Sequence, residues 1–232
     1  MSSWPAISAD QMREVDRAMI EDFHIELVQM MENAGRSLAD LAVDVYAPRR
    51  VVVLAGAGGN GGGGLVAARH LANRGLEVQV VLDRGADRLT GVPAHQLDIL
   101  ARMGIPISTG QPGPADLVVD ALIGYSLVGD PTGAAAELID WANGQSAPVL
   151  SLDTPSGLDV TTGEAARPCV RAATTLTLAL PKTGLLDAPE VGRLYLADIS
   201  VPPLLYRRMG IDAGDLFGDD QIVALCRHSS AS

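Results

Sequence analysis

A run of glycines between a short apolar segment and a helical pattern is the feature that most constrains the fold of this chain. Residues 51–54 (VVVL) are typical of a buried strand, residues 56–64 (GAGGNGGGG) follow as a turn, and Leu65 to Asn73 continue as a helix. Glycine permits positive φ angles and lets the backbone approach a ligand closely, and the first amides of a helix attract anions. The order of strand, turn and helix therefore predicts a loop that cradles a phosphate. A tight strand–helix connection without a ligand is the competing interpretation.

The run differs from two common phosphate-binding motifs. Gly62, Gly63 and Gly64 lengthen it beyond the usual dinucleotide fingerprint. No Lys-Ser or Lys-Thr pair follows Gly64, so it is not a Walker loop. Asp83, directly after the next predicted strand, is a candidate for the acid that binds a ribose in dinucleotide-binding folds.

Short apolar runs alternate with helical patterns along the rest of the chain. We predict helices over residues 10–22, 27–46, 65–73, 93–103 and 134–143, and strands over 51–54, 77–82, 105–107, 116–122, 148–152, 174–180 and 194–197. This alternation predicts an α/β fold with three α/β/α layers, a mainly parallel sheet and two N-terminal helices. We expect residues 1–232 to form a single domain, with residues from about 214 onwards as a candidate mobile tail.

The charge balance limits the partners of such a domain. The formal net charge is −11, which disfavours nucleic acids and anionic membranes as partners, and the simplest meaning of the acidity is solubility. The chain has no run of 18 apolar residues and no apolar signal core near its start, so we expect a cytoplasmic protein without a membrane span. Cys169 and Cys226 lack the spacing of a disulfide framework or a zinc site. The histidines do not fall at strand ends, so carboxylates are the better candidates for acid–base chemistry.

Two aspartates stand where predicted strands end. Asp120 opens the segment DALIGYSLVGDPTG, and Asp153 lies in LDTPSGLDVTTG. One such aspartate alone favours a turn or cap, but two beside a glycine-rich turn favour a site, because ligands of open α/β sheets bind at the carboxyl ends of strands. Oxygen atoms of Asn60, Asp120 and Ser156 suit a hard cation. Lys182, at another strand end, is equally consistent with neutralising a phosphate and with a solvated turn.

Together these segments resemble the YjeF N-terminal domain family. The resemblance extends from about Met12 to Tyr206 and includes MREVDRAMIEDFHIELVQMMENAG, the glycine run, both aspartate segments, LTLALPKTGLL and LYLADISVPPLLY. Members are best known as NAD(P)H-hydrate epimerases, which interconvert the R and S epimers of hydrated NADH and NADPH. The resemblance implies a Rossmann-like fold, a homodimer and a bound potassium ion.

The resemblance also implies roles for individual positions. The family's phosphate loop falls on Gly59, Asn60, Gly61, Gly62 and Gly63, and its second nucleotide-contacting loop falls on Gly124, Tyr125, Ser126, Leu127, Val128, Gly129 and Asp130. Potassium ligands fall on Asn60, Asp120 and Ser156. Asp153 falls on a further substrate contact and is our candidate for the catalytic acid–base residue.

The glycine run departs from the family at two positions. The family usually has GNNGGDG where this chain has GGNGGGG, so Gly59 replaces an asparagine and Gly63 replaces an aspartate. The missing carboxylate at position 63 predicts altered substrate contacts or the loss of a proton-transfer group. The alternative hypothesis is therefore a catalytically impaired nucleotide-binding or interaction module. An ordinary NAD-dependent dehydrogenase leaves the DTPSGLD segment and the N-terminal helices unexplained.

Overall fold

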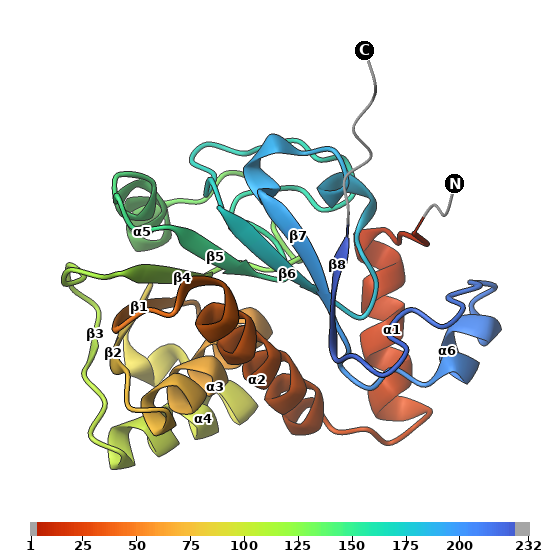
Figure 1. The fold of residues 1–232 in the computed structure, drawn as a ribbon, viewed down its shortest axis with the longest axis horizontal. Helices are drawn as coiled ribbons and strands as arrows, with labels where there is room; N and C mark the ends of the chain where they lie inside the picture. The colour runs from red at the N-terminus through yellow and green to blue at the C-terminus, as the bar shows by residue number, and fades with distance from the viewer. Residues whose placement is uncertain (1–3, 226–232) are drawn as a thin grey trace.

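An eight-stranded sheet runs through the middle of the protein (Figure 1). The structure is a computed structural model and describes residues 4–225. The strands lie in the order β3-β2-β1-β4-β5-β6-β7-β8; β1 to β7 are parallel, and β8 pairs with β7 in antiparallel register. Their bounds are β1 (Arg50–Ala55), β2 (Glu77–Leu82), β3 (Ile107–Ser108), β4 (Leu117–Ala121), β5 (Val149–Leu152), β6 (Thr174–Leu178), β7 (Arg193–Ala197) and β8 (Ile222–Leu225).

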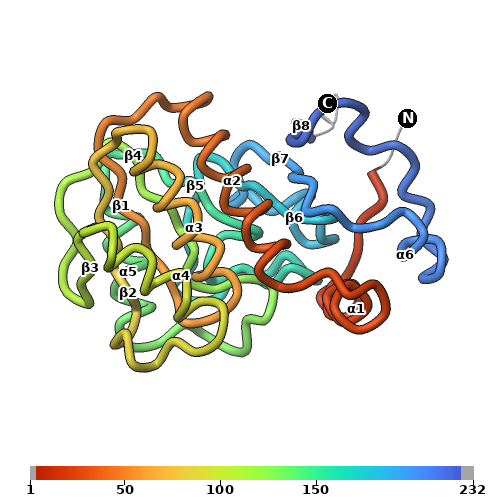
Figure 2. Tube along the Cα trace, turned by 90° about the horizontal axis from the view of Figure 1, so that it is seen from below, coloured from red at the N-terminus to blue at the C-terminus, as the bar shows by residue number. Residues whose placement is uncertain are grey.

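Helices cover both faces of this sheet. Three of them, α2, α3 and α4, lie together on one face, while α5 covers part of the other face (Figure 1). Helices α1 and α6 pack together beside the β6–β8 end (Figure 2). The bounds are α1 (Ala9–Glu21), α2 (Leu27–Tyr46), α3 (Gly59–Asn73), α4 (Gly91–Arg102), α5 (Gly133–Asn143) and α6 (Pro203–Arg208), with 3₁₀ turns at Ala86–Arg88, Thr183–Leu185 and Pro189–Val191. The three-layer α/β/α architecture predicted from the sequence is confirmed.

The side chains of β1 explain why its sequence is continuously apolar. Val51, Val53 and Ala55 belong to the core under α2, α3 and α4, whereas Val52 and Leu54 belong to the core under α5. A strand that is covered on both faces cannot alternate between apolar and polar residues. The same requirement holds for β4, whose five residues are all buried.

Helix α3 begins six residues earlier than predicted, at Gly59 rather than at Leu65. Most of the glycine run is therefore helical, and its glycines from Gly61 to Gly64 are packing positions. A Cβ added at Gly61 would overlap the carbonyl oxygen of Gly56, and one at Gly64 would lie 2.5 Å from the Cβ of Ala121. The absence of side chains lets α3 approach the sheet closely, and this tertiary packing overrides the low helix propensity of glycine.

Two elements near the C-terminal end were not predicted. Helix α6 begins at the second of two consecutive prolines, and β8 forms the edge of the sheet, with Ile222 opposite Ala197 and Leu225 opposite Leu194. Strand β8 falls inside the segment that the sequence suggested as a tail, and residues 226–232 lie outside the described residues.

Candidate active site

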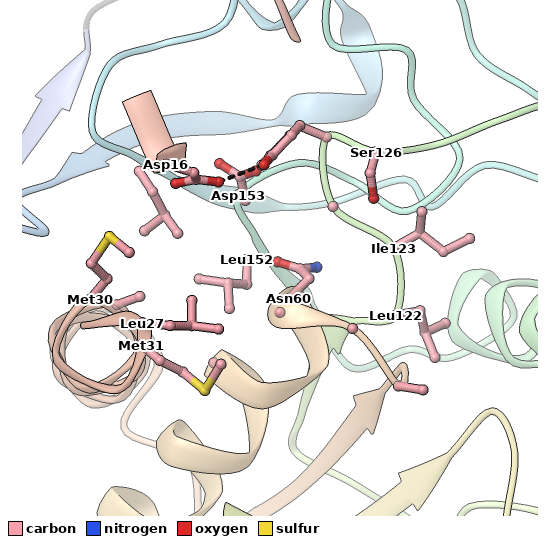
Figure 3. A pocket seen from close by; sticks show the side chains of 18 of the residues that line it. Asp16, Leu27, Met30, Met31, Asn60, Leu122, Ile123, Ser126, Leu152 and Asp153 are labelled. Carbon is pink, nitrogen blue, oxygen red and sulfur yellow. Dashed lines mark hydrogen bonds between the residues drawn. The ribbon is translucent and has the colours of Figure 1, made fainter. Parts of the chain in front are cut away.

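A pocket of about 380 Å³ opens at the carboxyl ends of β1, β4 and β5, beside the first turn of α3 (Figure 3). This is the position where ligands bind in open α/β sheets. Helices α1 and α2 supply a largely apolar wall that consists of Met12, Leu27, Met30, Met31 and Ala34. Polar side chains come from α1, the first turn of α3 and the strand ends, namely Asp16, Asn60, Asp83, Arg84, Tyr125, Ser126 and Asp153.

The start of the glycine run faces this pocket. Gly58 and Gly59 line it, and a Cβ added at either position would meet no atom within 4 Å. Gly58 is the N-cap of α3, so the first amides of that helix, which have no acceptor within the helix, lie at the pocket. An anion such as a pyrophosphate is favoured there by both the amides and the helix dipole.

The five residues of the predicted phosphate loop separate into two groups. Gly59, Asn60 and Gly63 line the pocket. Gly61 instead packs against the backbone of Gly56, the residue that follows β1, and a Cβ at Gly62 would lie 2.5 Å from the Cε of Met31. These two glycines hold α3 close to its neighbours and are absent from the pocket lining.

The second predicted loop also contributes only in part. Gly124, Tyr125 and Ser126 line the pocket, whereas the next four residues of the predicted set, Leu127, Val128, Gly129 and Asp130, are not among its lining residues. Val128 is 90% exposed, and the Asp130 carboxylate accepts a hydrogen bond from the Arg167 amide at 3.0 Å.

Asp153 and Lys182 form a buried ion pair beside the pocket. Asp153 directly follows β5 and has a φ of 65°, a left-handed conformation that is uncommon for aspartate. Lys182, the one lysine of the chain, has no exposed surface and donates to Oδ1 of Asp153. It also donates to Thr177 Oγ1 at 3.2 Å and to the Leu178 carbonyl at 3.0 Å. Lys182 is thus neither solvated nor among the pocket-lining residues.

The second oxygen of Asp153 has a different environment. Within residues 4–225, Oδ2 takes part in no hydrogen bond, although the side chain lines the pocket. One oxygen therefore anchors the carboxylate to Lys182, and the other is available to a ligand.

Asp16 is a pocket residue that our reading of the sequence missed. It lies on α1, and its carboxylate accepts a hydrogen bond from the Tyr125 hydroxyl, which Figure 3 marks with a dashed line. Burial raises the pKa of Asp16, and the nearby Asp153 carboxylate adds to this effect, while Tyr125 and Lys182 lower it. The available signal was its position on the helix face that also carries the buried Met12, Val15 and Met19.

Asp120 lies at the end of β4 and has no exposed surface. Its carboxylate accepts hydrogen bonds from Ser151 Oγ at 2.8 Å, Ser156 Oγ at 2.5 Å, the Ser156 amide at 2.9 Å and the Leu122 amide at 3.3 Å. Burial raises the pKa of Asp120, and the four donors oppose that shift. In the described part of the chain, no basic side chain pairs with this carboxylate.

Of the three residues predicted to hold potassium, Asp120 and Ser156 are joined by hydrogen bonds, and Asn60 lies close to Gly124 in the loop after β4. The Ser156 hydroxyl joins Asp120 to Ile123, whose amide donates to it at 2.8 Å. A Cβ added at Gly124, the next residue, would lie 3.5 Å from Oδ1 of Asn60. Asn60 Nδ2 is buried and has no hydrogen-bond partner among residues 4–225; turning the amide by 180° would put an oxygen there that a cation satisfies. The residues therefore fit a hard cation with oxygen ligands.

Asp83, the candidate ribose-binding acid, also lines the pocket. Its side chain is almost fully buried, and Arg84 binds it through Nε at 3.0 Å and Nη2 at 2.6 Å. The end of β2 thus offers both an acid and an arginine to the pocket.

The cysteines supply no activated thiolate in the described structure. Burial raises the pKa of Cys169 to about 12, so its thiol stays protonated at neutral pH. Cys226 and His228 lie outside the described residues.

A parallel sheet with a helix N-terminus and several acidic side chains around one pocket defines an α/β protein of the nucleotide-binding type. Comparison with known sequences makes this specific. Residues 27–184 match the family model described as YjeF-related protein N-terminus, and the chain belongs to that family.

Several relatives carry names that describe an activity. A protein named NAD(P)H-hydrate epimerase from Dehalogenimonas lykanthroporepellens is 49% identical over 214 residues, which cover 88% of this chain and 86% of the relative. Another protein of the same name, from Truepera radiovictrix, is 38% identical over 89% of this chain and 94% of its own length. A Bifunctional NAD(P)H-hydrate repair enzyme Nnr from Salinibacter ruber is 36% identical, and the match covers 88% of this chain but 42% of that protein.

A solved structure shares the whole fold. The crystal structure of yeast ynu0 superposes with a TM-score of 0.84 at 25% identity and covers 95% of this chain and 99% of its own. No helix within residues 4–225 is long and apolar enough to cross a membrane.

Proposed function

We propose that this protein interconverts the R and S epimers of hydrated NADH and NADPH, as an NAD(P)H-hydrate epimerase in the repair of nicotinamide nucleotides. The observation that carries the proposal is the similarity to proteins of that name along nearly their whole length, including 49% identity to one of them. The pocket supports it, because an anion-binding helix end and pocket carboxylates lie together in one cavity.

The reaction requires a site that promotes the loss and return of one hydroxyl group. The hydrated ring carries a hydroxyl on a carbon next to the ring nitrogen. When that hydroxyl leaves with a proton, the nitrogen lone pair forms a C=N bond and the ring becomes cationic. Water then adds to the other face and gives the opposite epimer. The protein must therefore supply a proton donor and offset a transient positive charge.

The pocket residues divide these tasks in our proposal. The amides of the first turn of α3 bind the pyrophosphate, and Asp83 binds a ribose hydroxyl. The apolar wall around Met30 and Met31 excludes bulk water from the ring. Asp153 presents Oδ2 to the ring and stabilises the developing cation, while Lys182 fixes the carboxylate in place.

A potassium ion held by Asn60, Asp120 and Ser156 is part of the proposal. Its support is the buried Asn60 amide without a partner and the buried Asp120 carboxylate without a basic partner in the described chain. When bound, the ion would supply positive charge that fixes the β4 and β5 loops. The homodimer, the cytoplasmic location and the lack of a nucleic-acid partner stay predictions.

The alternative, a nucleotide-binding module with impaired catalysis, is not favoured. It is based on Gly59, which lacks the family's usual asparagine, and on Gly63, which lacks the family's usual carboxylate. A Cβ at this position would lie 2.7 Å from Cδ2 of Leu152, so an apolar side chain occupies part of that space. Asp16 and Asp153 nevertheless supply two carboxyl groups to the same pocket.

The test starts from the purified R epimer of hydrated NADH with potassium present. Chromatography follows the appearance of the S epimer, and the uncatalysed rate is subtracted. We expect the protein to accelerate the exchange without oxidising or reducing the nucleotide. Nucleotide binding without accelerated exchange would favour the binding module instead.

A further inference from the structure

We propose that Asp16 of α1 is the proton-transferring catalytic residue of this site, with the Tyr125 hydroxyl as its positioning partner. The proposal rests on the epimerase function proposed above and assigns the acid–base role that the sequence suggested for Asp153. The glycine run and the aspartate segments do not predict a role for α1. Asp16 reaches the site because α1 packs against the pocket in the folded protein.

The surroundings of Asp16 favour a carboxyl group that exchanges a proton. It faces the pocket together with the apolar Met12, Met30 and Ile199, and Tyr125 and Asp153 are the polar neighbours there. Its one hydrogen bond within residues 4–225 comes from Tyr125, and no basic side chain pairs with it there. An acid in such a place loses hydration without gaining a cation, so its neutral form is favoured.

Asp153 has the opposite environment at the same end of the pocket (Figure 3). Its Oδ1 contacts the ammonium group of Lys182, which also binds Thr177 and Leu178. That contact fixes one oxygen of Asp153 against a buried ammonium group, whereas Asp16 has no such partner among residues 4–225. Two neighbouring carboxyl groups in different environments are the usual arrangement for dividing acid–base work from charge stabilisation.

The pKa directions agree with this division. Burial is the largest cause that raises the pKa of Asp16, and the charge of Asp153 raises it further. Burial and the neighbouring Asp16 raise the pKa of the Tyr125 phenol, so this hydroxyl stays protonated and continues to donate. The other groups to consider are Lys182, which lowers the pKa of Asp16, and the buried phenol of Tyr206, which α6 adds to the cluster around α1.

The proton balance needs no further reactant. Protonated Asp16 gives its proton to the ring hydroxyl, the C–O bond breaks with its electron pair on oxygen, and water leaves. The ring nitrogen supplies the pair that forms the C=N bond. Water then bonds to the same carbon on the opposite face and loses a proton to the Asp16 carboxylate, which restores the starting state. The exchange is redox-neutral throughout.

The test measures kcat and KM for epimer exchange across pH in the full chain, for the natural protein and three variants. Asp16→Asn removes the transferable proton, so we expect kcat to fall by about 10²–10⁴-fold with little change in KM. In the natural protein the rate should fall as pH rises through the pKa of Asp16, because the protonated form is required. That high-pH limb should be absent from the residual activity of Asp16→Asn.

Tyr125→Phe tests whether Tyr125 acts on the proton equilibrium of Asp16, because a purely structural role would not shift the pH dependence of the rate. The Tyr125 hydrogen bond lowers the pKa of Asp16, so its loss should move the high-pH limb to higher pH. Glu21→Gln is the matched control, because Glu21 is an exposed acid on the same helix, and it should leave both constants and the limb unchanged.

The outcomes separate the two proposals. A natural protein that does not accelerate exchange contradicts the epimerase function and the role of Asp16 with it. An active natural protein whose Asp16→Asn variant keeps its kcat and its high-pH limb contradicts only the role of Asp16. If Asp16→Asn does not fold, the Tyr125→Phe variant provides the test. A high-pH limb at the same pH as in the natural protein would contradict the role of Asp16.

Discussion

The ends of β4 and β5 each carry a buried aspartate, and the two are stabilised in different ways. Asp120, near the end of β4, relies on four neutral hydrogen-bond donors and is not a pocket-lining residue. Asp153 after β5 relies on a buried ammonium group, and it lines the pocket. Burying a charged group costs free energy unless hydrogen bonds or an opposite charge stabilise it. The partners of each carboxylate therefore bear on its role.

The difference assigns separate roles to two neighbouring strand ends. At Asp120 the donors satisfy the oxygens but leave one negative charge uncompensated, which favours a cation nearby. At Asp153 the charge is already balanced, one oxygen is fixed, and the other can face a ligand. In our proposal the first site holds a structural ion, and the second faces the reacting ring.

The largest expected effect comes from removing the partner of Asp153. Lys182→Met keeps most of the side-chain volume but leaves a buried carboxylate unpaired, so the free energy of unfolding should fall by about 3–5 kcal/mol. Urea unfolding measures this loss. The double variant Lys182→Met/Asp153→Asn should lose less than the sum of the single variants; strict additivity would mean that the two side chains do not act as a pair.

Removing one donor from Asp120 should have a smaller effect. Ser151→Ala deletes the 2.8 Å hydrogen bond to Oδ2, which should lower the free energy of unfolding by about 1.5–3 kcal/mol. Ser126→Ala is a control from the pocket rim and should change stability much less. Equal losses in the free energy of unfolding would contradict the prediction, because the hydrogen bond to Asp120 would then contribute no more than the Ser126 side chain.

Potassium should give the smallest change. An ion that binds the folded state at ten times its Kd adds about 1.4 kcal/mol to the free energy of unfolding. Thermal unfolding in potassium chloride and in choline chloride at equal ionic strength should differ for the natural protein. The difference should disappear in Asp120→Asn; its persistence there would place any ion elsewhere.

The sequence specified the sheet far better than the details of the glycine run. Continuous apolar segments such as 51–54 report coverage on both faces of a strand, which is a local consequence of the fold. The helical start at Gly59 was not predictable from propensity, because glycine is a poor helix former. Only the close approach of Gly61 to Gly56 and of Gly62 to Met31 explains that start.

The candidate site shows the same limit. Asp120, Asp153 and Asn60 could be named because each lies at the end of a predicted strand or in the glycine turn. Asp16 and Tyr125 are 109 residues apart in the sequence, so no local pattern predicts the hydrogen bond between them. The burial of Lys182 against Asp153 likewise depends on how β5 and β6 lie side by side.

Epimer exchange by the natural protein and by Asp153→Asn tests the central claim most directly. With the purified R epimer of hydrated NADH and potassium present, the natural protein should form the S epimer well above the uncatalysed rate. Asp153→Asn should reduce kcat by about 10²–10³-fold, because the developing cation loses its carboxylate. A natural protein that gives only the uncatalysed rate, or an Asp153→Asn variant as fast as the natural protein, would contradict the account.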